Sequence, residues 1–165
     1  MGVFDSFLSI FGIGQKQTDT TTQNVQSQQK KVLIVEDEEM LAKALEMKLT
    51  HDGFAVALAA NGQLGIEAAQ SFLPDIILVD IMMPVMDGKA MVKKLRQLPQ
   101  FKTTPVIILT NAGTIENMEE AKLGLGISDF LIKSNVNLDE VAAKIRMLLP
   151  NINQPVSQTG IPQQA

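Results

Sequence analysis

The 165-residue sequence contains no cysteine, no tryptophan and no tyrosine. Without cysteine there is no disulfide bond, thiolate nucleophile or thiolate metal ligand, so any bound metal ion must use oxygen ligands. The absence of tryptophan and tyrosine removes the aromatic surfaces on which bases and sugars stack. The apolar residues are mainly aliphatic, with nine methionines, a composition that suits the core of an α/β domain.

The sequence also has no excess of basic residues: it contains 14 lysines and arginines and 18 aspartates and glutamates, so the formal net charge is −4. Binding to the phosphate backbone of nucleic acid depends on clustered basic residues, so we expect no direct nucleic-acid binding. No run approaches the roughly 20 apolar residues that span a bilayer, and the N-terminus lacks the pattern of a secretory signal. We therefore expect a soluble, cytoplasmic protein without a transmembrane segment.

The length allows one domain with a proper core. Residues 15–30 are rich in glutamine and threonine, with Val25 as the single aliphatic residue, and this composition predicts a disordered linker. Residues 150–165 are polar and uncharged, which predicts a disordered tail. Between them, residues 31–149 have the usual size of one folded domain.

Polar residues follow four short apolar runs of this domain. The runs and the residues after them are 32–35 before Glu36 and Asp37, 76–79 before Asp80, 106–109 before Thr110, and 130–132 before Lys133. Continuous runs of valine, isoleucine and leucine are typical of parallel strands that are buried on both faces of a sheet. Because ligands bind outside the carboxyl ends of such strands, we expect these polar side chains to converge.

Helical and strand patterns alternate along the domain. A fifth strand is predicted at 54–58, and helices are predicted at 39–50, 62–72, from the turn at 84–88 to residue 98, 115–123 before the breaking Gly124 and Gly126, and 138–149. Strict alternation predicts an α/β fold: a doubly wound, five-stranded parallel sheet with helices on both faces. The flavodoxin-like strand order 2-1-3-4-5 is the simplest arrangement, and it makes Asp37 and Asp80 neighbours.

The converging side chains indicate phosphoryl chemistry. Three neighbouring carboxylates stay ionised only if a cation offsets their repulsion, and Mg²⁺ suits Asp37 and Asp80 as direct ligands with Glu36 acting through water. Asp80 is then a candidate nucleophile, and Lys133 and Thr110 are candidates to stabilise the phosphoryl oxygens. Taken singly, each residue has a commoner role as a turn, cap or surface residue. Their occurrence together at successive strand ends favours the functional interpretation.

Four segments carry a family resemblance: Val-Glu-Asp-Glu at 35–38, Asp-Ile-Met-Met-Pro-Val-Met-Asp-Gly at 80–88, Ile-Leu-Thr at 108–110 and Phe-Leu-Ile-Lys at 130–133. They resemble the receiver domain of bacterial two-component response regulators, of the stand-alone type that resembles chemotaxis regulators.

The resemblance implies a role for each residue of these segments. It implies that Asp80 is the phospho-acceptor and that Mg²⁺ is bound by Glu36, Asp37, Asp80 and the main-chain carbonyl of Met82. It further implies that Lys133 contacts the phosphoryl group, and that Thr110 and Phe130 are the two switch positions.

The same resemblance implies the partners. A histidine kinase or phosphotransfer protein would supply the phosphoryl group, and the receiver would act as a switch that catalyses its own phosphorylation and dephosphorylation rather than as a turnover enzyme. Phosphorylation would alter the surface of the fourth helix, fifth strand and fifth helix, which would bind an output protein or a second copy of the chain. Glycines around the fourth helix, Gly113, Gly124 and Gly126, would ease that movement.

Two other functions fit the same fold. A magnesium-dependent aspartyl-phosphate phosphatase needs an acid-base aspartate two residues after its nucleophile, where this chain has Met82. A receiver-like interaction module that works without phosphorylation is the second alternative, and the presence of Asp37, Asp80, Thr110 and Lys133 argues against it.

Two positions depart from the family pattern. Asn111 stands where a small residue is usual, and its amide is expected to crowd the path of water and change the phosphoryl lifetime. Ser134 replaces the proline that commonly follows the lysine with a cis bond, so we expect a trans peptide there.

Residues 1–14 lie outside the resemblance and form a short amphipathic segment. Val3, Phe4, Phe7, Leu8 and Phe11 lie on one face of a helix that is too short to be stable alone. The segment is predicted either to dock on a partner or membrane surface, or to fold back on its own domain or remain disordered. The lack of lysine and arginine in it disfavours the membrane.

Overall fold

The computed structural model describes residues 29–111, 118–135 and 137–149. The amphipathic segment, most of the predicted linker, the C-terminal tail and Gly113 lie outside the described residues. Gln29 and Lys30, which the composition assigned to the linker, are described. Lys30 Nζ lies 3.0 Å from Asp75 Oδ1, and the Lys30 carbonyl accepts a hydrogen bond from the amide of Ala55.

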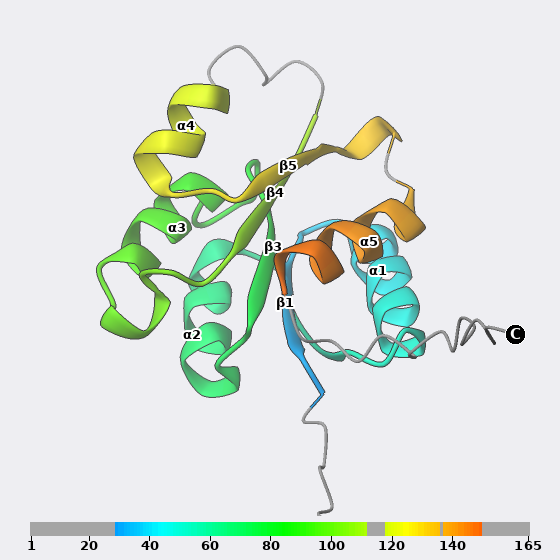
Figure 1. Ribbon diagram of the computed structural model, residues 1–165. Coiled ribbons are helices and arrows are strands. Elements are labelled where there is room, and N and C mark those ends of the chain that lie inside the picture. The colour runs from blue at the N-terminus through cyan, green and yellow to red at the C-terminus, as the bar shows by residue number, and fades with distance from the viewer. Residues whose placement is uncertain (1–28, 112–117, 136, 150–165) are drawn as a thin grey trace, which may run out of the picture.

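The domain alternates strands and helices as predicted (Figure 1). The elements are β1 Lys31–Val35, α1 Glu39–His51, β2 Ala55–Ala59, α2 Gly62–Phe72, β3 Ile76–Asp80, α3 Gly88–Arg96, the 3-10 turn η1 Pro99–Phe101, β4 Val106–Thr110, α4 Met118–Leu125, β5 Asp129–Ile132, the 3-10 turn η3 Lys133–Asn135 and α5 Leu138–Leu148. The five strands form one parallel sheet in the order β2-β1-β3-β4-β5, which confirms the predicted topology. None of the described helices is long and apolar enough to cross a bilayer.

Two helical layers cover the sheet (Figure 1). Helices α1 and α5 cover one face, and α2, α3 and α4 lie on the other. Successive residues of a strand point to opposite faces of the sheet. Ile34 and Leu78 pack on the side of α1 and α5, whereas Val35 and Val79 pack on the opposite side. Burial of both faces explains why the strands are continuous apolar runs rather than alternating patterns.

Helix α3 is shorter than predicted, because it ends at Arg96 and not at residue 98. The amide of Leu98 bonds back to the carbonyl of Leu95, and Leu98 itself is extended, with φ −89° and ψ 123°. The residue before a proline is disfavoured in the helical region, so Pro99 ends the helix and begins η1. The second strand is also shifted by one residue from its predicted bounds.

The end of α4 corrects another prediction, since Gly124 lies inside the helix and does not break it. Gly126 ends the helix with φ +61°, a conformation that favours glycine. The amide of Ile127 donates to the carbonyl of Lys122, the bond of a Schellman cap. From α3, the Arg96 guanidinium donates to the carbonyls of Leu125 and Gly126. The C-terminal end of α4 is therefore positioned both by the backbone conformation of Gly126 and by the hydrogen bonds from Arg96.

Candidate functional site

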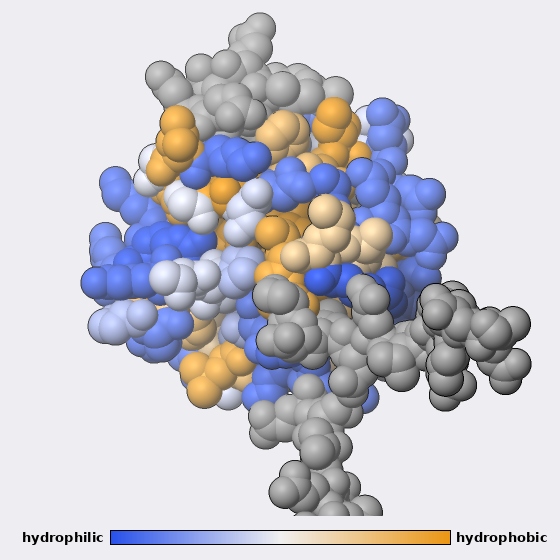
Figure 2. Space-filling view, in the orientation of Figure 1, coloured by the Kyte–Doolittle hydropathy of each residue, from blue (hydrophilic) through white to orange (hydrophobic). Residues whose placement is uncertain are grey.

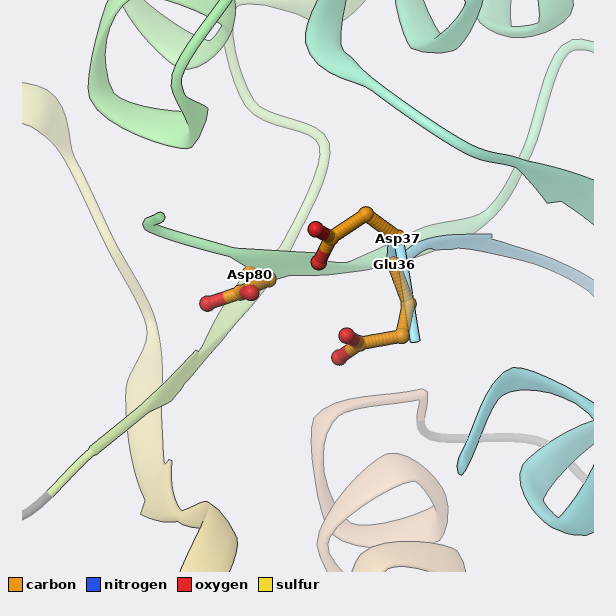
Figure 3. Close-up of side chains that lie close together, drawn as sticks. All are labelled: Glu36, Asp37 and Asp80. Atoms are coloured by element: carbon orange, nitrogen blue, oxygen red, sulfur yellow. The ribbon is translucent and has the colours of Figure 1, made fainter. Parts of the chain in front are cut away.

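The three predicted carboxylates meet at the carboxyl edge of the sheet (Figure 3). Glu36 and Asp37 follow β1, and Asp80 ends β3 on the neighbouring strand. Each residue offers a carboxylate oxygen, and these oxygens lie within 4.8 Å of one another. In Figure 3 the carboxyl groups of Glu36 and Asp37 both turn toward Asp80. The reversal of strand order beside β1 and β3 brings them together.

Lys133 joins the cluster from the end of β5. Its ammonium lies 2.6 Å from Glu36 Oε1 and 2.7 Å from Asp80 Oδ2. Glu36 and Asp80 are each only 3% exposed, whereas Asp37 is open to solvent. One ammonium therefore faces two buried carboxylates and a third at the surface, and the site keeps an excess of negative charge.

Burial and pairing act in opposite directions on the pKa values of this site. Burial raises the pKa of Glu36 above its usual value, although the bonds from Lys133 and from the amide of Glu38 oppose the shift. Burial also acts to lower the pKa of Lys133, but the bonds to Asp80 and Glu36 outweigh it and the pKa of Lys133 is raised. Lys133 is therefore a cation at neutral pH.

One oxygen of the site lacks a partner. Among the described residues, Glu36 Oε2 is the one buried side-chain oxygen or nitrogen without a hydrogen bond. Leaving such an atom unsatisfied costs about 1–3 kcal/mol. A hydrated divalent cation beside Asp37 and Asp80 would give this oxygen a water donor and offset the remaining negative charge. The donor set, made only of oxygen atoms, thus fits Mg²⁺.

The loop after β3 supports Asp80 from its backbone. The amide of Met82 donates to Asp80 Oδ1 over 3.1 Å, and the amide of Gly88 donates to the carbonyl of Ile81. A Cβ atom on Gly88 would lie only 2.0 Å from the carbonyl oxygen of Asp80. Gly88 is therefore required by the close approach of the two backbones, a role that the sequence analysis missed. The Asp-Gly pair that follows Met86 was the available signal.

Val85 holds a tight turn in the same loop. Its φ of +68° is unusual for a β-branched residue, and the amide of Met86 bonds to the carbonyl of Pro84 over 2.7 Å. The Met86 carbonyl in turn accepts the amide of Gly62, at the start of α2. The turn is thus fastened to a second element, and neither the strain at Val85 nor the contact of Gly62 was predicted.

The two predicted switch residues lie on the neighbouring strands. Thr110 ends β4, is almost fully buried and donates through Oγ1 to the carbonyl of Asn111 over 3.3 Å. Phe130 is half-buried on β5, pairs in register with Ile108 and packs against the cluster under α2 and α3. Asn111, the residue after Thr110, is exposed. The described residues contain no cis peptide bond, so the bond between Lys133 and Ser134 is trans, as expected.

The family is shown by comparison with known proteins. The model of the response regulator receiver domain matches residues 32–146. The chain is 37% identical over 119 residues to the response regulator ArlR of Staphylococcus aureus, a match that covers 72% of this chain and 52% of that protein. The chain belongs to the response regulator receiver domain family, and thus to two-component signalling proteins. It spans about half the length of the curated relatives that it matches.

Solved structures agree with this assignment. The chemotaxis response regulator CheY4 of Vibrio cholerae is 30% identical, with a TM-score of 0.68 over 73% of this chain and 99% of that chain. The receiver domain of the sensor histidine kinase PA1611 of Pseudomonas aeruginosa is 27% identical, with a TM-score of 0.65 over 73% of this chain and 97% of that chain. That structure contains a magnesium ion coordinated in the active-site cleft.

Proposed function

We propose that Asp80 accepts a phosphoryl group from a phosphohistidine of a histidine kinase or phosphotransfer protein. The observation that carries this proposal is the placement of Asp80 between Lys133 and the acidic pair Glu36 and Asp37. A carboxylate oxygen of Asp80 attacks phosphorus, the phosphorus–nitrogen bond breaks, and its electron pair returns to the imidazole nitrogen of the donor. Lys133 neutralises the charge that spreads over the phosphoryl oxygens during transfer.

Mg²⁺ is the proposed metal, held by Glu36 through water, by Asp37 and Asp80 directly, and by the main-chain carbonyl of Met82. When bound, it neutralises phosphoryl charge and holds the group in line for transfer. The amide of Met82 holds Oδ1 of Asp80 and the ammonium of Lys133 holds Oδ2, so the carboxylate is fixed in orientation for attack. The unpartnered Oε2 of Glu36 supports the acidic pair as part of a hydrated cation site.

The output of the switch is a surface of α4, β5 and α5. In this proposal the Thr110 hydroxyl leaves the carbonyl of Asn111 and bonds to the phosphoryl group. The space that it leaves allows Phe130 to turn inward, which changes the surface around β5. An output protein, or a second copy of the chain in a phosphorylation-dependent dimer, would read this change. The chain then works in the cytoplasm as a switch and not as a turnover enzyme.

We also propose that residues 31–149 are the receiver, that residues 15–30 are a linker whose disorder ends before Lys30, which pairs with Asp75, and that residues 150–165 are a disordered tail. The match of the family model to residues 32–146 supports these limits. The amphipathic residues 1–14 would be joined to the receiver by the linker.

Intact mass spectrometry tests the phosphorylation. The parent and Asp80→Asn are incubated with acetyl phosphate, with and without Mg²⁺, and Asp75→Asn at the opposite edge of the sheet is the control. We expect a metal-dependent phosphate adduct in the parent and in Asp75→Asn, and none in Asp80→Asn. An unmodified parent that also fails to bind BeF₃⁻ would favour a receiver-like module that acts without phosphorylation.

A further inference from the structure

An open groove of about 840 Å³ lies between α3, the end of α4 and the loop after β3. Its size falls within the range of about 300–1,000 Å³ that is usual for binding pockets. Figure 2 shows apolar side chains set among hydrophilic ones over the face of α3 and α4. The apolar part of the groove lining consists of Ile81, Met82, Met83, Ala90 and Leu125.

The apolar floor of the groove reaches solvent at Met82, which is 64% exposed. Met83 and Leu125 are half-buried beside it. Single exposed apolar side chains are normal on a protein surface, but a concave group of them is typical of a binding site. A methionine side chain is flexible and polarisable, so it adapts to apolar surfaces of different shape. The floor therefore suits the apolar side chains of a partner.

Helix α3, which forms one wall of the groove, is basic although the chain is acidic. Its nine residues contain three lysines, one arginine and no acidic residue, whereas the whole chain has a formal net charge of −4. A cation in the last turn, such as Lys93, is favoured by the helix dipole. Lys89 lies in the first turn, where the dipole disfavours a cation, and it stands four residues before Lys93, so the two ammonium groups repel each other. The helix by itself gains nothing from a lysine at position 89.

The two lysines that line the groove are exposed, and neither forms an ion pair with a residue that the structure describes. The acidic residue of the lining, Asp87, is the N-cap of α3 and accepts a hydrogen bond from the amide of Ala90 over 2.7 Å. Its carboxylate is thus held by its own helix. Lys89 and Lys93 give the groove a basic border, and an anionic partner would relieve the repulsion between them.

We infer that this groove is a docking site for an acidic amphipathic segment of a partner protein. Apolar side chains on one face of the segment fill the floor, and aspartates or glutamates beside that face pair with Lys89 and Lys93. A helix that lays its apolar face into a groove is a recurring mode of protein recognition. The basic border excludes a basic segment, because like charges that face each other across an interface are costly.

The groove fits a protein segment better than nucleic acid or a membrane. The chain has no tryptophan or tyrosine on which bases could stack. Polybasic sites for anionic lipids usually contain about four to eight lysines and arginines, and two lysines line this groove. An apolar floor with a short charged border is the pattern of a protein contact.

This docking site differs from the output surface proposed above. It lies between α4 and α3, whereas the output surface continues from α4 to β5 and α5. Its floor is fixed by hydrogen bonds from the amide of Met82 to Asp80 Oδ1 and from the amide of Gly88 to the carbonyl of Ile81. A preformed floor loses little conformational entropy on binding. Docking in the groove therefore requires no phosphorylation.

Methionine-methyl NMR of the full chain tests the docking. The probe is a synthetic helix of about 18 residues with leucine along one face and glutamate on both sides of that face, and the control peptide has lysine in place of glutamate. We expect the glutamate peptide to shift the methyl signals of Met82 and Met83 to saturation and to leave Met40 and Met47, exposed on α1, unchanged. Unchanged signals of Met82 and Met83 would overturn the inference, and so would equal shifts from the lysine peptide.

A charge reversal tests the basic border. Lys89→Glu/Lys93→Glu should weaken binding of the glutamate peptide by about tenfold and strengthen binding of the lysine peptide. Lys94→Glu/Lys102→Glu is the matched control, because it changes the net charge equally at two exposed lysines that do not line the groove. Equal weakening by the two pairs would indicate attraction to the overall charge and would contradict docking in the groove.

A polar replacement tests the apolar floor. Met82→Gln keeps the size of the side chain, and it should weaken binding of the glutamate peptide by roughly three- to tenfold, as followed at Met83. Met47→Gln is the matched control, since Met47 is 72% exposed on α1 and lies away from the groove. Circular dichroism checks that both variants are folded. An affinity that is unchanged in Met82→Gln would refute the floor as the anchor.

Other anions distinguish a protein segment from the remaining partners. Without Mg²⁺, neither inorganic phosphate nor vesicles of phosphatidylglycerol and phosphatidylcholine should shift the signals of Met82 and Met83. Vesicles that broaden these signals, with no response to the peptide, would overturn the inference in favour of a membrane surface. None of these measurements uses a phosphoryl donor, so their failure is distinct from a failure of Asp80 to be phosphorylated.

Discussion

Lys133 Nζ lies 2.7 Å from Asp80 Oδ2, although 53 residues separate the two along the chain. The same ammonium lies 2.6 Å from Glu36 Oε1, so one cation stabilises two buried carboxylates at the ends of adjacent strands. This arrangement makes the proposed chemistry and the stability of the fold depend on the same side chain.

Lys133→Met should lower the free energy of unfolding by about 3 kcal/mol in the absence of metal, because it leaves two buried carboxylates without their cation. Urea denaturation measures the change. Lys144→Met is the matched control: it breaks a lysine–aspartate pair with Asp129 that is about one quarter exposed, and it should cost less than about 1 kcal/mol. Equal losses in the two variants would contradict a special role for the buried pair.

Mg²⁺ should stabilise the parent and not Asp37→Asn. A ligand at ten times its dissociation constant adds about 1.4 kcal/mol to the free energy of unfolding. Without the metal, Asp37→Asn should be at least as stable as the parent, because removing one of three close carboxylates relieves repulsion. Urea denaturation with and without Mg²⁺ measures both effects, and Asp75→Asn should respond to the metal as the parent does.

Gly88→Ala should destabilise the protein by about 1–3 kcal/mol and slow the phosphorylation of Asp80. Its Cβ atom would stand 2.0 Å from the carbonyl oxygen of Asp80, so the backbone of the site must shift. Gly124→Ala is the contrasting variant, since a Cβ atom there meets open space inside a helix and should stabilise by roughly 0.5–1 kcal/mol. Thermal unfolding distinguishes them, and a neutral Gly88→Ala would refute the close approach.

The contribution of Asp129 to stability should disappear in acid. Burial acts to raise the pKa of Asp129, but the bonds from Lys144 and from the amide of Phe130 outweigh it and the pKa is lowered. A carboxylate with a lowered folded-state pKa stabilises the protein above its unfolded pKa of about 3.9 and ceases to do so as pH falls through the folded value. The stability difference between the parent and Asp129→Asn should therefore be constant from pH 5 to 7 and shrink below about pH 4. Urea denaturation across this range measures it; a difference independent of pH would contradict the pairing.

Asn111→Ala should shorten the lifetime of the phosphorylated form by a factor of a few. Asn111 follows Thr110 at the end of β4 and is exposed, and we expect its amide to hinder the approach of water to a phosphoryl group on Asp80. Loss of the phosphate adduct with time, followed by intact mass, gives the rate. Equal rates of phosphate loss in the parent and in Asn111→Ala would contradict this role of the Asn111 amide.

The strands, their order and the identity of the acidic residues were predictable from the sequence because they depend on local patterns. Apolar runs such as 76–79 identify buried strands, and alternation with helices leaves few topologies. Once the order is known, the ends of β1 and β3 must be adjacent, so the meeting of Asp37 with Asp80 required no side-chain detail.

Other features required the packed structure. Local signals placed the end of α4 at Gly124, but the helix continues to Leu125 and is fastened there by Arg96 from α3, 29 residues away. The need for glycine at position 88 arises from the backbone of Asp80: the Asp-Gly pair indicates a turn, but the close approach itself is seen only in the packed structure.

The sequence by itself therefore determined the sheet, the edge that carries the site and the chemical groups at that edge, because hydrophobic periodicity and strand-end polarity are properties of neighbouring residues. Only the tertiary structure decided which two carboxylates Lys133 pairs with, which oxygen of Glu36 stays unpartnered and how the groove beside Met82 is shaped. These depend on distances of a few ångströms between segments far apart in the chain, and such distances are set by packing.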